Sequence, residues 1–200
     1  MPRQAWLVIP GLPHHIIQRG NNRQRIFFDD DDYLAMLALL RQSSEKTGTR
    51  YNAYCLMPNH YHLIGTSPDE KALSAAIGYI QLCYSLRIKE RYGYIGHLWQ
   101  GRFSSFPMDD EYYANALHYV ECNPSRAKIV QHPWEYPWSS AQAHITGRDP
   151  YRVLDMDSWL QYYTPAEWME WLNRETDSTF IEQFRQHSVS GALLQAKKKR

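Results

Sequence analysis

The chain has 200 residues, of which 44% are hydrophobic, and its formal net charge at pH 7 is +1. This length and composition suit one globular domain with a modest appendage, and they allow a sizeable core. A net charge this small excludes the class of strongly basic proteins that attract nucleic acid through their total positive charge. Three cysteines without CxxC spacing argue against a disulfide framework or a cysteine-based zinc site, and fit a reducing cytoplasm. No apolar stretch predicts a signal peptide or a membrane-spanning helix.

The charges are segregated along the sequence. Asp29 to Asp32 form an acidic run, whereas Arg19, Arg23 and Arg25 cluster with no acid among them. The chain ends in a basic tail formed by Lys197, Lys198, Lys199 and Arg200. A local cationic groove is therefore compatible with the small net charge, although such tails more often form a solvated surface.

The N-terminal part of the chain predicts three strands and one helix. Strand-like segments bounded by turn residues lie at 14–19, 51–57 and 60–66. The turn Gly20-Asn21-Asn22 follows the first segment, and Pro58-Asn59 joins the other two as an antiparallel hairpin. A helix is predicted over 29–46, because its four opening acids can satisfy the N–H groups of its first turn.

The remaining elements complete a recognisable order. The pattern predicts a helix over 72–91, a strand over 103–108, and a helix over 109–123 that Pro124 ends. This β-α-β-β-α-β order followed by a helix indicates an α+β fold, a ferredoxin-like antiparallel sheet with helices on one face. Farther on, a capping box at Thr164 and Glu167 and a helix over 178–187 predict a C-terminal helical extension docked on this domain.

A pair of histidines opens the third predicted strand. His60 and His62 are two residues apart, so on a strand both imidazoles lie on one face and can share a divalent metal ion. The bare pattern is weak, because nine histidines in 200 residues would give about 0.4 such pairs by chance. Two strand histidines without any metal are the alternative.

The helix that ends at Pro124 carries a second candidate group. Tyr119 and Asn123 are four residues apart, so their side chains share one helix face. Asn123 can offer a carbonyl oxygen to a hard cation that the two imidazoles also bind. The other helical tyrosines have no oxygen ligand four residues later. A core aromatic and a helix-closing polar residue remain the alternatives for Tyr119 and Asn123.

Several segments agree in order along the chain. They are Cys55 to His62 (CLMPNHYH), 98–103 (LWQGRF), 119–124, 137–140 (PWSS) and the turn 19–23 (RGNNR). Together they resemble the REP-associated branch of the single-tyrosine HUH transposases, over roughly residues 5 to 145. One position departs from the HUH pattern: Tyr61 stands between the histidines, where a bulky aliphatic residue is usual.

The resemblance implies an enzyme that recognises imperfect palindromes folded as single-stranded DNA hairpins, cleaves beside them, and rejoins strands through a 5′-phosphotyrosine. By position, His60, His62 and Asn123 would hold Mg²⁺ or Mn²⁺, and Tyr119 would be the nucleophile. The chain would comprise a catalytic domain, residues 1–145, and a C-terminal helical extension with the basic tail, residues 146–200. We expect a domesticated cytoplasmic transposase tied to repetitive extragenic palindromes, monomeric, with a dimer as the alternative.

Contacts to DNA are expected from basic and amide side chains. We favour Arg19, Arg23, Arg25 and Arg102 as phosphate partners, and the basic tail more weakly. Asn21 and Asn22 could reach base edges, yet they equally suit a turn. Rings such as Trp99 and Phe103 could stack on unpaired bases, although buried packing is at least as common for them.

Two other functions compete with strand transfer. The same fold could be a catalytically silent, hairpin-binding regulator, but the nucleophile and all three proposed ligands are present. A metal-dependent hydrolase that uses water instead of Tyr119 is the second alternative. Labelled hairpin DNA with Mn²⁺ separates the three, because only the transferase forms a covalent adduct that Tyr119→Phe abolishes.

Overall fold

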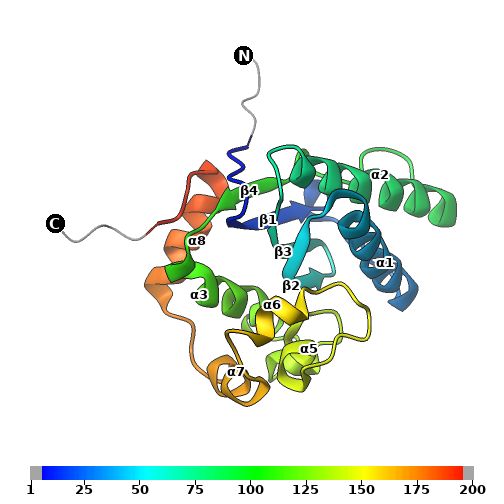
Figure 1. The fold of residues 1–200 in the computed structure, drawn as a ribbon. Coiled ribbons are helices and arrows are strands. Elements are labelled where there is room, and N and C mark those ends of the chain that lie inside the picture. The colour runs from blue at the N-terminus through cyan, green and yellow to red at the C-terminus, as the bar shows by residue number, and fades with distance from the viewer. Residues whose placement is uncertain (1–5, 196–200) are drawn as a thin grey trace.

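A computed structural model describes residues 6–195 and contains a four-stranded sheet surrounded by helices (Figure 1). The strands are β1 (Pro13–Arg19), β2 (Arg50–Met57), β3 (His60–Thr66) and β4 (Ser104–Pro107). The helices are α1 (Asp30–Thr47), α2 (Ala72–Tyr92), α3 (Asp110–Glu121), α4 (Asn123–Arg126), α5 (Ala141–Thr146), α6 (Met156–Leu160), α7 (Pro165–Leu172) and α8 (Ser178–Ser190). The 3₁₀ turns are η1 (Asn21–Arg23) and η2 (Pro133–Glu135). The predicted β-α-β-β-α-β order is confirmed.

The sheet has the strand order β2-β3-β1-β4, and every neighbouring pair is antiparallel. In the register, His62 of β3 lies opposite Ile17 of β1 and Cys55 of β2. Residues opposite each other in an antiparallel sheet point to the same face. The side chains of β3 therefore alternate between the two faces of the sheet, with His60 and His62 on one face and Tyr61 and Leu63 on the other.

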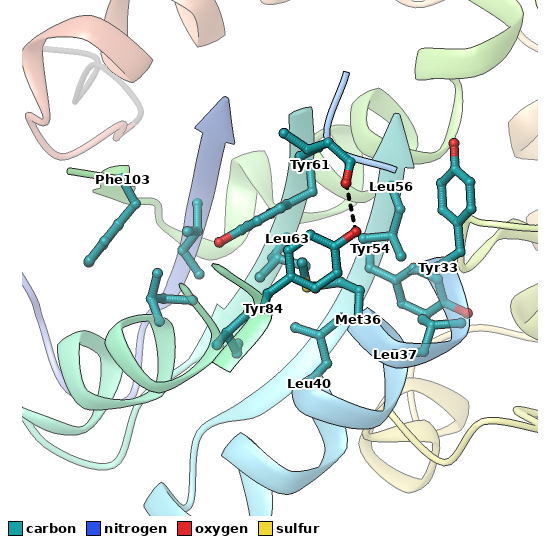
Figure 2. Close-up of a cluster of buried hydrophobic side chains, with 14 of the residues drawn as sticks. Tyr33, Met36, Leu37, Leu40, Tyr54, Leu56, Tyr61, Leu63, Tyr84 and Phe103 are labelled. Atoms are coloured by element: carbon teal, nitrogen blue, oxygen red, sulfur yellow. Dashed lines mark hydrogen bonds between the residues drawn. The ribbon is translucent and has the colours of Figure 1, made fainter. Parts of the chain in front are cut away.

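One face of the sheet packs against α1 and α2, and we call it the α1–α2 face. Figure 2 shows its core, in which Leu56, Tyr61 and Leu63 of the sheet meet Leu37 of α1 and Tyr84 of α2. Tyr61, the residue that departs from the family pattern, is thus buried in the hydrophobic core. Within residues 6–195, no helix is long and apolar enough to cross a membrane.

The ends of α1 follow the expected chemistry. The Asp29 side chain accepts a hydrogen bond from the backbone N–H of Asp32, which caps the N-terminus. Gly48 ends the helix in the left-handed conformation, with φ of 72°. Two residues separate α1 from β2, so the Gly48 turn fixes how the chain enters β2, whereas a longer connection that contains η1 joins β1 to α1.

The opposite face packs against α3 and α8, and we call it the α3–α8 face. Its core joins Cys55, Ile64 and Phe106 of the sheet to Val120 of α3 and Phe184 of α8. The prediction of helices on one face therefore holds for α1 and α2 only. Helices cover both faces, so nearly all strand residues are buried on either side, and α8 of the extension completes the second layer (Figure 1).

The predicted helix over 109–123 is interrupted. α3 ends at Glu121, and Asn123 begins the short helix α4, in which Pro124 occupies the first turn. Pro124 is accommodated because a first-turn residue needs no hydrogen-bonded N–H. It therefore lies in the first turn of α4 instead of ending α3, and the end of α3 lies two residues before the predicted one.

The segment that follows α4 covers one edge of the sheet, and the C-terminal extension covers the other. Along β2, the N–H of Leu56 donates to the carbonyl of Trp138, and the N–H of Ser140 donates to that of Tyr54. Along β4, the N–H of Leu194 donates to the carbonyl of Pro107. Covering edge strands in this way prevents them from pairing with other chains. The predicted capping box at Thr164 and Glu167 is also confirmed.

A buried carboxylate ties α3 to α5 and to α7 of the extension. Glu121 is fully buried and accepts hydrogen bonds from the Ser140 hydroxyl, from His144 Nδ1 at 2.6 Å, and from Trp168 Nε1 at 2.8 Å. His144 in turn stacks on Trp159 of α6, with ring centroids 4.4 Å apart. One side chain thus connects α3 with α5 and α7, and a buried carboxylate without these donors would be strongly destabilising.

Glu121→Gln tests this connection. The amide replaces one acceptor oxygen by an NH₂ group that faces buried donors, so the free energy of unfolding should fall by roughly 3 kcal/mol. Glu170→Gln, at an exposed position of α7, should change it by less than about 0.5 kcal/mol. Urea unfolding followed by tryptophan fluorescence measures both. Equal stability of the two variants would show that the network contributes nothing specific.

Candidate active site

A pocket of about 640 Å³ opens on the α3–α8 face, beside the end of β1 and the start of β3. Residues from β1, β3, the segment before β4, α3, α4 and α8 line it. They include Arg19, His60, His62, Arg102, Tyr119 and Asn123. The fold thus brings together predicted residues that are up to about a hundred positions apart in the sequence.

Strand alternation places both histidines in this pocket. The ring centroids of His60 and His62 are 5.0 Å apart, with their planes at 81°. His60 Nδ1 lies 2.7 Å from Oδ1 of Asn59, and the Asn59 amide is itself oriented by its bond to the carbonyl of Arg23 at 3.2 Å. Because an amide oxygen only accepts, His60 carries its proton on Nδ1. Its Nε2 lone pair has no partner among residues 6–195.

The surroundings keep these imidazoles neutral. Burial lowers the pKa of His60 to about 4, and the nearby Arg19 guanidinium adds to the shift. The pKa of His62 lies well below its usual range, mainly because the ring is buried and also because His15 is adjacent. A neutral imidazole has a lone pair to offer, which is the form that binds metal ions.

Tyr119 of α3 lies edge-to-face with His62. Its ring centroid is 6.0 Å from that of His62, with the planes at 83°, and 4.5 Å from that of Phe184 on α8. The side chain is largely buried, with 7% exposed, yet it lines the pocket. Its hydroxyl has no hydrogen-bond partner in the described part of the chain. The phenol is therefore held by packing while its hydroxyl is left for a ligand.

Asn123 lines the pocket beside Tyr119, and Arg126 packs against the Tyr119 ring. Asn123 begins α4 and lines the same pocket as Tyr119, although the break between α3 and α4 replaces the continuous helix that was predicted. The Arg126 guanidinium lies 4.1 Å from the centre of the Tyr119 ring and donates to the Tyr119 carbonyl at 2.6 Å. A cation in this place fixes the ring and adds positive charge beside it.

The predicted DNA contacts fall into three groups. Arg19 and Arg102 line the pocket and are exposed. Asn21, Asn22, Arg23 and Arg25 do not line it and lie in or just after η1, next to β1. The basic tail, Lys197 to Arg200, lies outside the described residues.

The turn η1 is shaped by its backbone. Asn22 and Arg23 have positive φ angles of 49° and 58°, and a side chain at Gly20 would collide with the carbonyl of Gln24. The N–H of Asn21 donates to the carbonyl of Leu98. The two asparagines therefore form the turn, as one of the two alternatives predicted, while the side chains of Asn22 and Arg23 remain exposed.

Trp99 and Phe103 pack in the core on the α1–α2 face, so the packing alternative holds for both.

The structure adds residues that the sequence reasoning did not assign to the site. Arg185 of α8 lines the pocket, and His15 bonds His62. Asn59 bonds His60 from the tight turn. The alternation of β1 could have placed His15 on the same face as Ile17, but nothing in the sequence pairs α8 with the sheet. Within residues 6–195, no three His, Cys, Asp or Glu side chains cluster as a metal site.

Comparisons with known proteins give one family and one fold. A family model described as "Transposase IS200 like" matches residues 9–123. A solved structure of a REP-associated tyrosine transposase bound to a REP hairpin has a TM-score of 0.62 at 20% identity, covering 78% of this chain and 94% of that one. At this identity, the likeness concerns the fold alone.

A second structure, of a predicted transposase from Deinococcus radiodurans R1, has 22% identity and a TM-score of 0.35, covering 66% of this chain and 94% of that one. A score this low carries no argument. No curated protein matches the chain. The family match spans more than half of the chain, from before β1 to Asn123, and with it the strands and the helix that form the pocket. The chain belongs to the IS200-like transposase family.

Proposed function

We propose that the chain is a metal-dependent single-stranded DNA endonuclease and strand transferase that acts next to hairpins of repetitive extragenic palindromes. One observation carries this proposal: the Tyr119 phenol lies beside paired neutral imidazoles in a single pocket with arginines at its rim. The neighbour of similar fold is bound to a REP hairpin, which supports the same class of DNA partner here. That likeness also favours the REP-associated branch within the family.

The residues present fit a divalent metal ion. His60 offers an unpartnered Nε2 lone pair, His62 is neutral, and Asn123 adds a side-chain oxygen at the same pocket. Such a mixed nitrogen and oxygen set suits Mg²⁺ or Mn²⁺ when DNA or water supplies further oxygens. When bound, the ion would neutralise charge on the scissile phosphate and orient it.

The chemistry assigned to Tyr119 is a covalent exchange. Its hydroxyl oxygen attacks phosphorus in line, a new phosphorus–oxygen bond forms, and the bond to the 3′-oxygen breaks. The phenol proton is transferred overall to the 3′-oxygen, which leaves a 5′-phosphotyrosine and a free 3′-hydroxyl. Because the phosphodiester energy is kept in the tyrosine link, another 3′-hydroxyl can reverse the step without ATP.

The pocket supplies positive charge around this reaction. Arg126 lies over the Tyr119 ring, and Arg19, Arg102 and Arg185 line the pocket. Positive charge near the phosphate favours both the anionic nucleophile and the charge of the transition state. The residues of η1 extend this surface away from the pocket, where we assign them to contacts with the hairpin. The division of the chain at residue 145 stays a prediction, and α8 contributes to the same pocket from beyond it.

Tyr119→Phe tests the nucleophile. Incubation of the wild-type protein with a labelled hairpin-bearing single strand and Mn²⁺ should give a covalent protein–DNA adduct on denaturing gels. Tyr119→Phe should reduce the adduct by at least about 10³-fold, because it removes the attacking oxygen. Tyr112→Phe, on the same helix but stacked on Phe180, should leave it unchanged.

The same experiment separates the alternatives. Tight hairpin binding by the wild type with neither adduct nor nicking would favour the silent regulator. Nicking that persists in Tyr119→Phe would favour the hydrolase that uses water. Either result would end the proposal of a tyrosine nucleophile.

Removal of the metal provides a second test. EDTA, or His60→Ala with His62→Ala, should abolish adduct formation and Mn²⁺ binding while hairpin affinity stays within about tenfold, since arginine–phosphate contacts are independent of the ion. Mn²⁺ binding is followed by electron paramagnetic resonance and hairpin binding by fluorescence anisotropy. Undiminished cleavage in EDTA would contradict the metal role.

Arg19→Gln tests the phosphate contacts at the rim. Loss of one contact should weaken binding of all hairpin sequences about equally and reduce the slope of log affinity against log salt by about 1. Arg41→Gln is the matched control: Arg41 lies at an exposed position of α1, paired with Glu45, and its replacement should leave the slope unchanged. An unaltered slope in Arg19→Gln would place the DNA backbone elsewhere.

A further inference from the structure

A chain of hydrogen bonds leads from α8 to His62. The Ser188 hydroxyl donates to the carbonyl of Phe184 at 2.9 Å, and the same oxygen lies 3.4 Å from His15 Nδ1. His15 Nε2 then lies 2.8 Å from His62 Nδ1. The chain thus runs from the backbone of α8 through a histidine of β1 to a histidine of the pocket.

Counting protons along this chain gives it one direction. A hydroxyl has a single hydrogen, and that of Ser188 is used in its shorter bond to Phe184. The Ser188 oxygen can therefore only accept from His15, so His15 carries its proton on Nδ1. Its Nε2 is then an acceptor, and the bond to His62 requires the proton on Nδ1 of His62.

We propose that His15 and Ser188 are positioning residues that hold His62 in its Nδ1-protonated tautomer, so that its Nε2 lone pair faces the pocket. The consequence for metal binding rests on the proposed function, but the tautomer itself does not. Ligating histidines are usually oriented by a hydrogen bond to the second ring nitrogen, and here a histidine provides it in place of a carboxylate.

The packing around His15 makes this arrangement rigid. His15 is 1% exposed, and its ring lies nearly parallel to that of His62, at 17° with centroids 5.0 Å apart. Phe106 of β4 and Phe184 of α8 contact it at 5.2 and 4.5 Å between centroids. This packing on both sides restricts rotation of the His15 ring and keeps its two nitrogens directed at Ser188 and His62.

His60 reaches the same tautomer by a different route. There the acceptor is the Asn59 amide oxygen, whose orientation the Arg23 carbonyl fixes. Both histidines of the pair thus present Nε2 to the pocket. The relay of hydrogen bonds from Ser188 through His15 to His62 also depends on α8, which lies beyond the family match at residues 9–123. The C-terminal extension therefore determines the tautomer of His62, which lies within the region that the family model matches.

Nuclear magnetic resonance of the full-length, metal-free protein labelled with ¹⁵N-histidine tests the proposal. Long-range ¹H–¹⁵N correlations at neutral pH identify which ring nitrogen is protonated, and His62→Gln assigns the signal. We expect His62 to be protonated on Nδ1 in the wild type. His15→Phe should give a mixture of tautomers, and His15→Gln, whose amide oxygen can accept, should restore the wild-type signal.

Mn²⁺ alone, titrated by electron paramagnetic resonance, gives the second readout. His15→Phe should weaken its binding about 10- to 100-fold, and His15→Gln should recover most of it. Ser188→Ala should shift the tautomer of His62 in the same direction as His15→Phe, and Ser190→Ala on the same helix should not. Because Ser188 is only half-buried, its variant keeps the test valid if His15→Phe fails to fold.

Three outcomes are decisive. An Nε2-protonated His62 in the wild type overturns the proposal, and so does an unchanged His62 signal in folded His15→Phe and Ser188→Ala. The expected tautomer together with no Mn²⁺ binding by the wild type supports the relay while rejecting the proposed metal function.

Discussion

The two-residue repeat of β3 is the constraint on which the site depends. His60 and His62 point to the α3–α8 face, whereas Tyr61 and Leu63 point into the core under α1 and α2. A slip of one residue in register would exchange the two sets and bury the imidazoles among aliphatic side chains. β3 is paired on both sides, with β1 and with β2, and it follows β2 after a two-residue turn, so that slip is strongly opposed.

Helix α3 places the Tyr119 phenol beside the histidines of β3. Tyr119 faces the pocket, while Glu121, two residues later, faces away and is bonded to Ser140 and His144 around α5 and to Trp168 of α7. Two residues correspond to about 200° around a helix, so one side of α3 is anchored and the other presents the phenol. The extension also supplies Phe184 against the Tyr119 ring. One face of α3 is therefore fixed by the Glu121 hydrogen bonds, and the opposite face carries Tyr119.

The small net charge conceals a strong local separation. Within the described residues, the acidic run at the start of α1 is bonded by Arg91, which lies 2.7 Å from Asp29, 3.2 Å from Asp31 and 2.9 Å from Asp32. These acids belong to the α1–α2 side of the molecule, whereas the pocket on the other face is lined by arginines and no acid. An anion thus meets positive charge at the pocket although the chain as a whole is nearly neutral.

The sequence by itself determined the order of the elements, the paired imidazoles and the family, because strand alternation, turn residues and motif spacing are local properties. It also placed Tyr119 and Asn123 near each other, although the break at Cys122 and the role of Pro124 depended on packing around α4. Only the tertiary structure decided that helices cover both faces, that Arg185 lines the pocket, and that His15 bonds His62. Those features join segments more than forty residues apart, and no local pattern encodes which apolar face will cover which strand.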